Sequence, residues 1–335
     1  MAWWMRTLTG ILFAIILVIM LAVSWLYLHV HSSITLPTKP FELSIQSGSN
    51  LNQVAKQLAE AGIIPTKWSF ILLARYLDQE SAIKAGDYEI SEDLTQIALL
   101  RYLTKGDSKQ REIKFIEGWT FAQLRKTLND HPDIKHDSIE LSELQILQHI
   151  GATETLAEGL FFPDTYFFVR GDSDLNVFRR AYQAMQNHLR THWLARSELL
   201  PLTTSYEALI LASIIEKETG LESDRPEIAG VFINRLRKGM RLQTDPTVIY
   251  GLGKEFDGNL RKKDLLADHA YNTYTRAGFP PTPIALPGLA SIRAALNPAQ
   301  TEALYFVAKG NGESHFSINL IDHNKAVNEY QKRQK

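Results

Sequence analysis

Two carboxylates stand at the end of an apolar run in the middle of this 335-residue chain. Within residues 208–215 only Ser213 is polar, so a helix formed here is apolar on nearly every face and should be buried. Glu216 and Glu218 follow, and Gly220 is a plausible stop for the helix. Two residues apart on a helix, these carboxylates point to nearly opposite sides and cannot form one paired site.

A single carboxyl group at such a helix end could act as a general acid. Apolar walls make a carboxyl group harder to ionise, so its pKa rises toward the range in which it donates a proton. The alternatives are a frayed helix end with two solvated glutamates, or a structural ion pair, since ion pairs also gather at helix ends. The helix alone leaves these interpretations open.

Amide, hydroxyl and aromatic side chains dominate the segments downstream of this helix. That mixture suits a neutral, hydroxyl-rich ligand with flat apolar faces, such as a sugar. The sequence has no phosphate-binding glycine loop and no Gly-x-Ser-x-Gly elbow. Each candidate could instead brace a loop or pack in the core. The candidates for substrate binding are Asn234, Gln243, Thr244, Asp245, Tyr250, Tyr271, Asn272, Thr273 and Tyr274.

The N-terminus carries the signature of a membrane anchor. Residues 8–28 contain no charge, and about 20 apolar residues span a bilayer as a helix. Arg6 precedes them, and aromatic residues stand near both ends, which predicts a cytoplasmic N-terminus and an extracytoplasmic remainder. Small residues at 22 and 24 also fit a cleaved signal peptide. The apolar run continues beyond them, which favours an uncleaved single-pass anchor.

The rest of the chain predicts an α+β protein. A short linker, residues 29–40, is stiffened by Pro37 and Pro40. Strand–turn–helix patterns then begin near Phe41, Asp87 and Ile113, and such units must pack together to bury their apolar faces. Further helices and a C-terminal hairpin follow. The predicted organisation is a tail at 1–7, an anchor at 8–28, the linker, a subdomain at 41–110 and a catalytic domain at 111–335.

Composition excludes several classes of function. The formal net charge is −1 and there is no long basic run, so no nucleic-acid partner is expected. The chain has no cysteine, so an exported fold would need no disulfide framework. His188 and His192 have the spacing of two zinc ligands, but their surroundings are charged and polar, and a solvated helix face is the better interpretation. No metal or cofactor is expected.

Four segments, in order and spacing, resemble the endolytic murein transglycosylases, the MltG or YceG-like family. They are residues 212–218 (ASIIEKE), 232–236 (FINRL), 241–251 (RLQTDPTVIYG) and 270–274 (AYNTY). The resemblance covers essentially everything after the membrane segment, and it places Glu218 on the family's catalytic glutamate. Glu216 falls on a companion position without an accepted catalytic role. Residues 41–110 correspond to the family's LysM-like subdomain.

The resemblance implies lytic cleavage of peptidoglycan at the β-1,4 bond between N-acetylmuramic acid and N-acetylglucosamine, inside glycan strands and without water. Glu218 would protonate the glycosidic oxygen and then accept the proton of the substrate's own C6 hydroxyl. The product would carry a 1,6-anhydro ring. Asp245 is interpreted as bracing its loop or binding sugar, although a second acid in the cleft would permit hydrolysis.

Two other functions are alternatives to lytic cleavage. One is a muramidase that hydrolyses the same bond. The other is a membrane-anchored peptidoglycan-binding scaffold in which the LysM-like part does the work. The resemblance also implies action on nascent glycan strands beside peptidoglycan synthases (penicillin-binding proteins), with the chain held in the bacterial inner membrane and the catalytic domain in the periplasm.

Overall fold

The computed structural model describes residues 13, 15–18, 20–21, 24–25, 27–28, 30–31, 33–46, 48–106 and 111–332. These fold as the predicted mixture of helices and small sheets, and the sheets of the described residues each have two strands. The chain divides into two compact units. The first contains residues up to Glu112 with Asp133–Lys135 and Phe167–Asp172, and the second contains the remainder.

In the first unit, two helices separate a pair of antiparallel strands along the chain. Phe41 of the first strand lies opposite Ile90 of the second. The core side chains alternate along both strands, as the two-residue period of a sheet requires. A capping box between Asn50 and Gln53 begins the first helix. The elements are β1 (Phe41–Ile45), α2 (Leu51–Glu60), α3 (Lys67–Tyr76), β2 (Gly86–Ile90) and α4 (Gln96–Lys105).

The stretch predicted as a linker is part of this folded unit. Val30, Ile34 and Leu36 are buried in the same core cluster as the residues of β1 and β2. The Ile34 N–H donates a hydrogen bond of 2.8 Å to the Leu94 carbonyl oxygen. The predicted linker is therefore packed against the unit at these three residues, while residues 37–40 are exposed.

Of the predicted membrane segment, residues 8–28, about half lies outside the described residues, including all of residues 8–12. Within the part of the chain that the structure describes, no helix is both long enough and apolar enough to cross a membrane.

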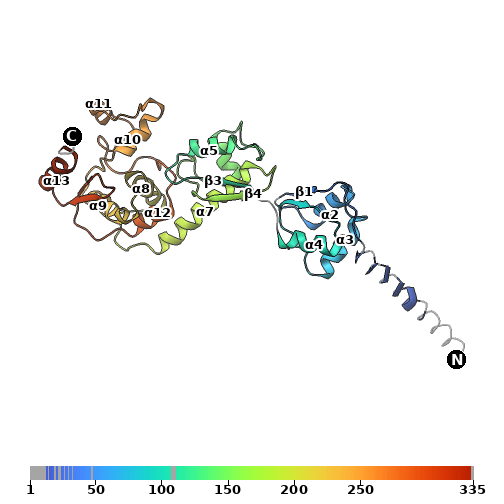
Figure 1. The fold of residues 1–335 in the computed structure, drawn as a ribbon. Helices are drawn as coiled ribbons and strands as arrows, with labels where there is room; N and C mark the ends of the chain where they lie inside the picture. Colours follow the sequence, from blue (N-terminus) through green and yellow to red (C-terminus); the bar gives the residue numbers. More distant parts are fainter. Residues whose placement is uncertain are drawn as a thin grey trace. The chain divides into compact units, whose positions relative to one another are not determined.

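The second unit is built mainly of helices, with α8 packed against α7, α9, α10 and α12 (Figure 1). Its principal elements are α5 (Phe121–Asn129), α6 (Glu143–Ile150), α7 (Asp174–Leu194), α8 (Ser205–Glu218), α9 (Arg225–Arg237), α10 (Asp245–Leu252), α11 (Lys262–Leu266), α12 (Leu289–Leu296), β5 (Tyr305–Ala308), β6 (Ser314–Ser317) and α13 (Leu320–Val327). The strands β3 (Arg111–Lys114) and β4 (Thr165–Phe168) each have residues in both units.

Helix α8 is buried as its composition predicts. Every residue of 208–215 is buried, and the Thr204 hydroxyl caps the helix by accepting a hydrogen bond from the Glu207 N–H. The single polar side chain of this run, Ser213, donates to the Ile210 carbonyl oxygen at 2.7 Å and accepts from the Ile284 N–H at 3.0 Å. A buried hydroxyl thus fixes the proline-rich segment 278–288 to the central helix.

Two elements differ from the prediction. The strand of the third predicted strand–turn–helix unit, β3, pairs with β4 and not with β1 or β2. The segment 241–251, for which the sequence predicted no helix, includes all but the last residue of α10, which starts at Asp245 with Pro246 in its first turn. Proline is favoured there because its missing N–H has no partner to lose within the helix.

Candidate active site

Glu218 is the last residue of α8, and the chain turns to an extended conformation at Thr219. Its carboxyl group is partly buried, and this burial is the main reason why its pKa is raised to about 7. The nearby Asp245 carboxylate raises the pKa further, while a hydrogen bond from Thr244 and the charge of Arg235 oppose the rise. The group can therefore be protonated near neutral pH and can also release its proton there.

Thr244 is fixed by a buried hydroxyl cluster. Its hydroxyl donates a hydrogen bond to Oε1 of Glu218. Its N–H donates to Oγ1 of Thr273 at 3.1 Å, and the Thr247 hydroxyl donates to its carbonyl oxygen at 2.8 Å. All three threonines are buried. The predicted residues Thr244 and Thr273 thus lie together, but Thr273 acts on the acid only by holding Thr244.

Three predicted residues surround the start of α10 beside this cluster. Asp245 is exposed and accepts a hydrogen bond of 2.5 Å from the Tyr274 hydroxyl. Gln243 is also exposed, and its φ of 48° lies in the left-handed region, which costs energy in any residue other than glycine. Its N–H donates to the Thr273 carbonyl oxygen at 3.2 Å. The backbone holds Gln243 in this conformation at the edge of the acid site.

Asn272 braces the segment that carries Thr273 and Tyr274. It is fully buried, and its amide nitrogen donates to the backbone carbonyl oxygens of Asp264, Leu265 and Ala267, the last at 2.7 Å. Its side-chain oxygen accepts from the Tyr274 N–H at 2.8 Å. With its hydrogen-bonding groups engaged and its surface covered, Asn272 has a structural role in this state of the protein.

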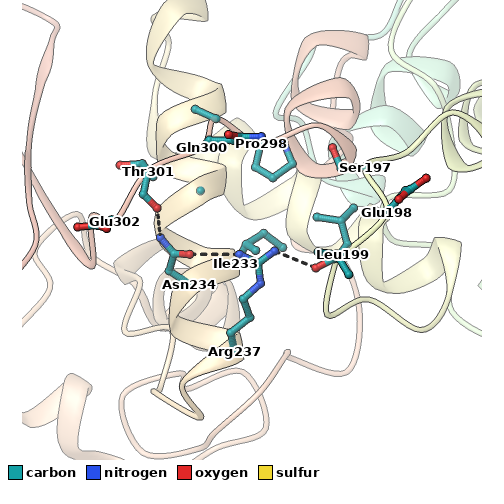
Figure 2. Close-up of a pocket in the computed structure, with 13 residues that line it drawn as sticks. Ser197, Glu198, Leu199, Ile233, Asn234, Arg237, Pro298, Gln300, Thr301 and Glu302 are labelled. Carbon is teal, nitrogen blue, oxygen red and sulfur yellow. Dashed lines mark hydrogen bonds between the residues drawn. The ribbon is translucent and has the colours of Figure 1, made fainter.

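Asn234 lies in a different pocket, shown in Figure 2. Its amide nitrogen donates to the carbonyl oxygens of Thr301 and Ala303, at 2.7 and 3.1 Å. Arg237, on the next turn of α9, donates to the Leu199 carbonyl oxygen at 2.8 Å. Asn234 therefore fastens the 301–303 segment to α9, and the structure does not bring it together with Thr244 and Glu218.

Both carboxylate oxygens of the companion residue, Glu216, accept hydrogen bonds. Its Oε1 accepts from the Arg225 guanidinium at 3.1 Å, and its Oε2 accepts from the Gly288 N–H and the Ser291 hydroxyl at 2.9 and 2.7 Å. The exposed fraction of its side chain is only 6%. This is a buried ion pair that joins α8 to α9 and α12, so two glutamates two residues apart have separate tasks.

The remaining predicted residues, Tyr250 and Tyr271, line a cavity of about 800 Å³ in the second unit. Their ring centroids are 4.9 Å apart with planes inclined at 59°. Lys217 and Pro246, the chain neighbours of Glu218 and Asp245, also line this cavity, which places it beside the acid site. We call it the tyrosine cavity.

A comparison with known proteins identifies the family. The model of the YceG-like family matches residues 43–329. The chain belongs to the YceG-like family. An endolytic murein transglycosylase of Bacillus subtilis is 34% identical over 307 residues, which cover 86% of this chain and 84% of the relative.

A second relative and a solved structure support the same family assignment. An endolytic murein transglycosylase of Streptococcus pneumoniae is 28% identical, and the match covers 86% of this chain but 58% of that longer relative. A crystal structure of a YceG-like protein from Listeria monocytogenes has a TM-score of 0.53 and 28% identity, covering 86% of this chain and 98% of that one. The resemblance seen in the four sequence segments is confirmed.

Two residues of this YceG-like site escaped the sequence analysis. Arg235 is buried, donates to the carbonyl oxygens of Leu242 and Leu304 at 2.7 Å each, and its charge lowers the pKa of Glu218. Glu158 is a second buried carboxyl group whose pKa is raised to about 7. Its only sequence signal is an acid beside Gly159 in an aromatic-rich segment. No group of metal-ligating side chains occurs among the described residues.

Proposed function

We propose that this YceG-like protein is a lytic transglycosylase that cleaves the β-1,4 bond between N-acetylmuramic acid and N-acetylglucosamine inside peptidoglycan glycan strands. The observation that carries the proposal is the carboxyl group of Glu218, partly buried and with a pKa of about 7. The names of the relatives from Bacillus subtilis and Streptococcus pneumoniae support the same reaction.

One carboxyl group suffices for this reaction. Protonated Glu218 gives its proton to the glycosidic oxygen as the C1–O bond breaks and positive charge develops on the sugar ring. The resulting carboxylate then accepts the proton of the C6 hydroxyl while that oxygen bonds to C1. The strand is cut, a 1,6-anhydro ring is formed, and Glu218 is protonated again. A pKa near 7 serves both proton transfers, because neither state is strongly favoured at neutral pH.

Hydrolysis of the same bond is the alternative that one observation favours. The charge of Asp245 is close enough to raise the pKa of Glu218. A hydrolase would use such a second carboxylate to activate water. Asp245 is engaged by the Tyr274 hydroxyl, which supports its role as a brace in the lytic reaction instead.

Location and partners complete the proposal. Residues 8–28 would anchor the chain in the bacterial inner membrane, with the second unit in the periplasm, where it would cut nascent strands beside peptidoglycan synthases. The first unit would be LysM-like and hold glycan. Its order of strand, two helices and strand supports this role. A pure binding scaffold is less well supported, since binding alone does not need a partly buried acid at Glu218.

The decisive experiment incubates the full-length chain in detergent with purified peptidoglycan and analyses the released muropeptides by mass spectrometry. The full chain is needed because Val30 belongs to the core of the first unit. We expect 1,6-anhydro ends, which weigh one water less than reducing ends. Reducing ends would show a hydrolase and implicate Asp245, whereas binding without products would show a scaffold.

The hydrogen bond from Thr244 to Glu218 predicts a change in pH dependence. This bond holds the pKa of Glu218 down, so Thr244→Val should raise that pKa. The alkaline limb of the profile of kcat/KM against pH follows loss of the proton from the acid, and it should move up by about one pH unit. Thr127→Val, which removes an exposed hydroxyl bonded to the Gln123 carbonyl oxygen, is the control. An unchanged alkaline limb in Thr244→Val would contradict the assignment of Glu218 as the acid.

A further inference from the structure

Glu158 is a buried carboxyl group for which the proposed reaction has no use. Its exposed fraction is 8%. Oε1 accepts a hydrogen bond of 3.0 Å from the N–H of Phe121, the first residue of α5, and Oε2 accepts one of 3.0 Å from the Tyr250 hydroxyl. Both carboxyl oxygens therefore have a donor. Because burying a carboxylate costs free energy, we expect the function of Glu158 to lie with its two donors, the Phe121 N–H and the Tyr250 hydroxyl.

The surroundings of Glu158 hold the carboxyl group in one place. Gly159 has a φ of 78°, and a Cβ built there would lie 2.3 Å from Cβ of Pro283, so a side chain would displace the proline-rich segment. Phe121 stacks on Phe161 with ring centroids 5.3 Å apart. The acceptor for the Tyr250 hydroxyl thus stands on a rigid base.

Tyr271, the second ring of the tyrosine cavity, is also held by a hydrogen bond of its hydroxyl group. The Tyr271 hydroxyl shares a hydrogen bond of 2.9 Å with Oγ1 of Thr282, which in turn donates to the Pro283 carbonyl oxygen at 2.7 Å. With both hydroxyl groups bound, the two rings keep their mutual inclination. They present two fixed aromatic faces at 59° to each other, so that the apolar face of a pyranose ring can stack on one while the other bounds its edge.

Glu158 acts on a different set of groups from Glu218. The charges that shift the pKa of Glu218 belong to Asp245 and Arg235. Burial, and after it the charge of Glu158, raise the pKa of Tyr250, which therefore stays a neutral hydroxyl donor. This separation argues against Glu158 as a second acid or base of the cleavage reaction.

We propose that Glu158 is a positioning residue: its carboxyl group fixes Tyr250 so that Tyr250 and Tyr271 form the aromatic corner that holds one sugar ring of the bound glycan strand. The inference rests on the proposed function, because it takes the occupant of the tyrosine cavity to be glycan. It assigns Glu158 to substrate binding and leaves proton transfer to Glu218.

Kinetics of single and double variants test the proposal. Tyr250→Phe removes the hydroxyl donor, and Glu158→Gln places an amide where two donors need acceptors. Each should raise KM about tenfold with kcat changed by less than about twofold, since leaving one partner of a buried hydrogen bond unpaired costs about one decade. The double variant should be no worse than either single one, because both changes break the same contact. KM values that multiply in the double variant would overturn the proposal.

A matched pair elsewhere in the unit supplies the control. Glu154 accepts a hydrogen bond of 2.9 Å from the Tyr182 hydroxyl, and neither residue lines the tyrosine cavity. Glu154→Gln should affect only the melting temperature. If Glu158→Gln likewise lowers the melting temperature but leaves KM unchanged, Glu158 is merely structural. If it does not fold, Tyr250→Phe alone decides by its KM.

Binding separates this proposal from the proposed function. Affinity for glycan strands freed of their peptide stems is measured in the Glu218→Gln background, where turnover does not interfere. Glu158→Gln or Tyr250→Phe should weaken that affinity about tenfold. Absence of cleavage products from the wild type would overturn the proposed function while this binding result still stands. Unchanged affinity would overturn the role of Glu158 alone.

Discussion

Replacing Glu218 with glutamine should lower the rate of glycan cleavage by roughly 10²–10⁴-fold, the range that a general acid contributes. Glutamine has nearly the same shape and can still accept the hydrogen bond from Thr244, but it has no proton to give. The rate of release of 1,6-anhydro ends, followed by mass spectrometry, measures the effect. Activity within a few-fold of the wild type would remove Glu218 from the mechanism.

Between pH 5 and pH 8, the Glu218→Gln variant should lose less stability than the wild type. The pKa of Glu218 rises from 4.5 to about 7 on folding, so the folded state binds its proton more tightly than the unfolded state. The wild type therefore loses stability from this group as the pH rises through the interval from 4.5 to 7, and glutamine does not. Thermal melts at pH 5 and pH 8 should show a smaller decrease for Glu218→Gln. A larger decrease would mean that the carboxylate is stabilising in the folded state.

Replacing Glu216 with alanine should cost about 3–5 kcal/mol of the free energy of unfolding. The change leaves the Arg225 guanidinium without its carboxylate, with only 10% of that side chain exposed. It also removes the acceptor for the Gly288 N–H and the Ser291 hydroxyl. Urea denaturation measures the loss. The cost is large because an unpaired charge stays buried.

Two further variants make this second prediction specific. Glu255→Ala removes an exposed carboxylate and should change the free energy of unfolding by less than about 0.5 kcal/mol. Glu216→Ala combined with Arg225→Met removes both charges and should recover part of the loss, since a methionine can fill the space without a charge. If Glu216→Ala were as stable as the wild type yet inactive, the interpretation of Glu216 as structural would be wrong.

The sequence was sufficient to predict the central helix, whereas the role of Glu218 as the acid stays a prediction. The apolar run at 208–215, followed by Gly220 as a stop, predicted the helix, and the structure places α8 at Ser205–Glu218. The expectation that the two glutamates would diverge follows from helix geometry and is confirmed by the separate partners of Glu216 and Glu218. Local patterns are informative here because the apolar run is long and unbroken.

The hydrogen-bond partners that lie far away in the sequence could not be predicted. Asn234 and Asn272 have the side chains of sugar-binding residues, but their amides hold backbone carbonyl oxygens of segments whose positions depend on tertiary packing. The same limit hid Glu158, whose partners Phe121 and Tyr250 are 37 and 92 residues away in the chain. Composition indicates which groups can bind sugar, and only packing decides which of them are already occupied.

The burial of Val30, Ile34 and Leu36 has a mechanical consequence. Residue 28 ends the apolar stretch, and Val30 is already a core side chain of the first unit. Only one residue separates the two, so a force on the N-terminal stretch acts directly on the core that contains β1 and β2. If residues 8–28 are embedded in lipid as proposed, a change in their tilt should rotate the first unit with them, because no linker longer than one residue separates the two.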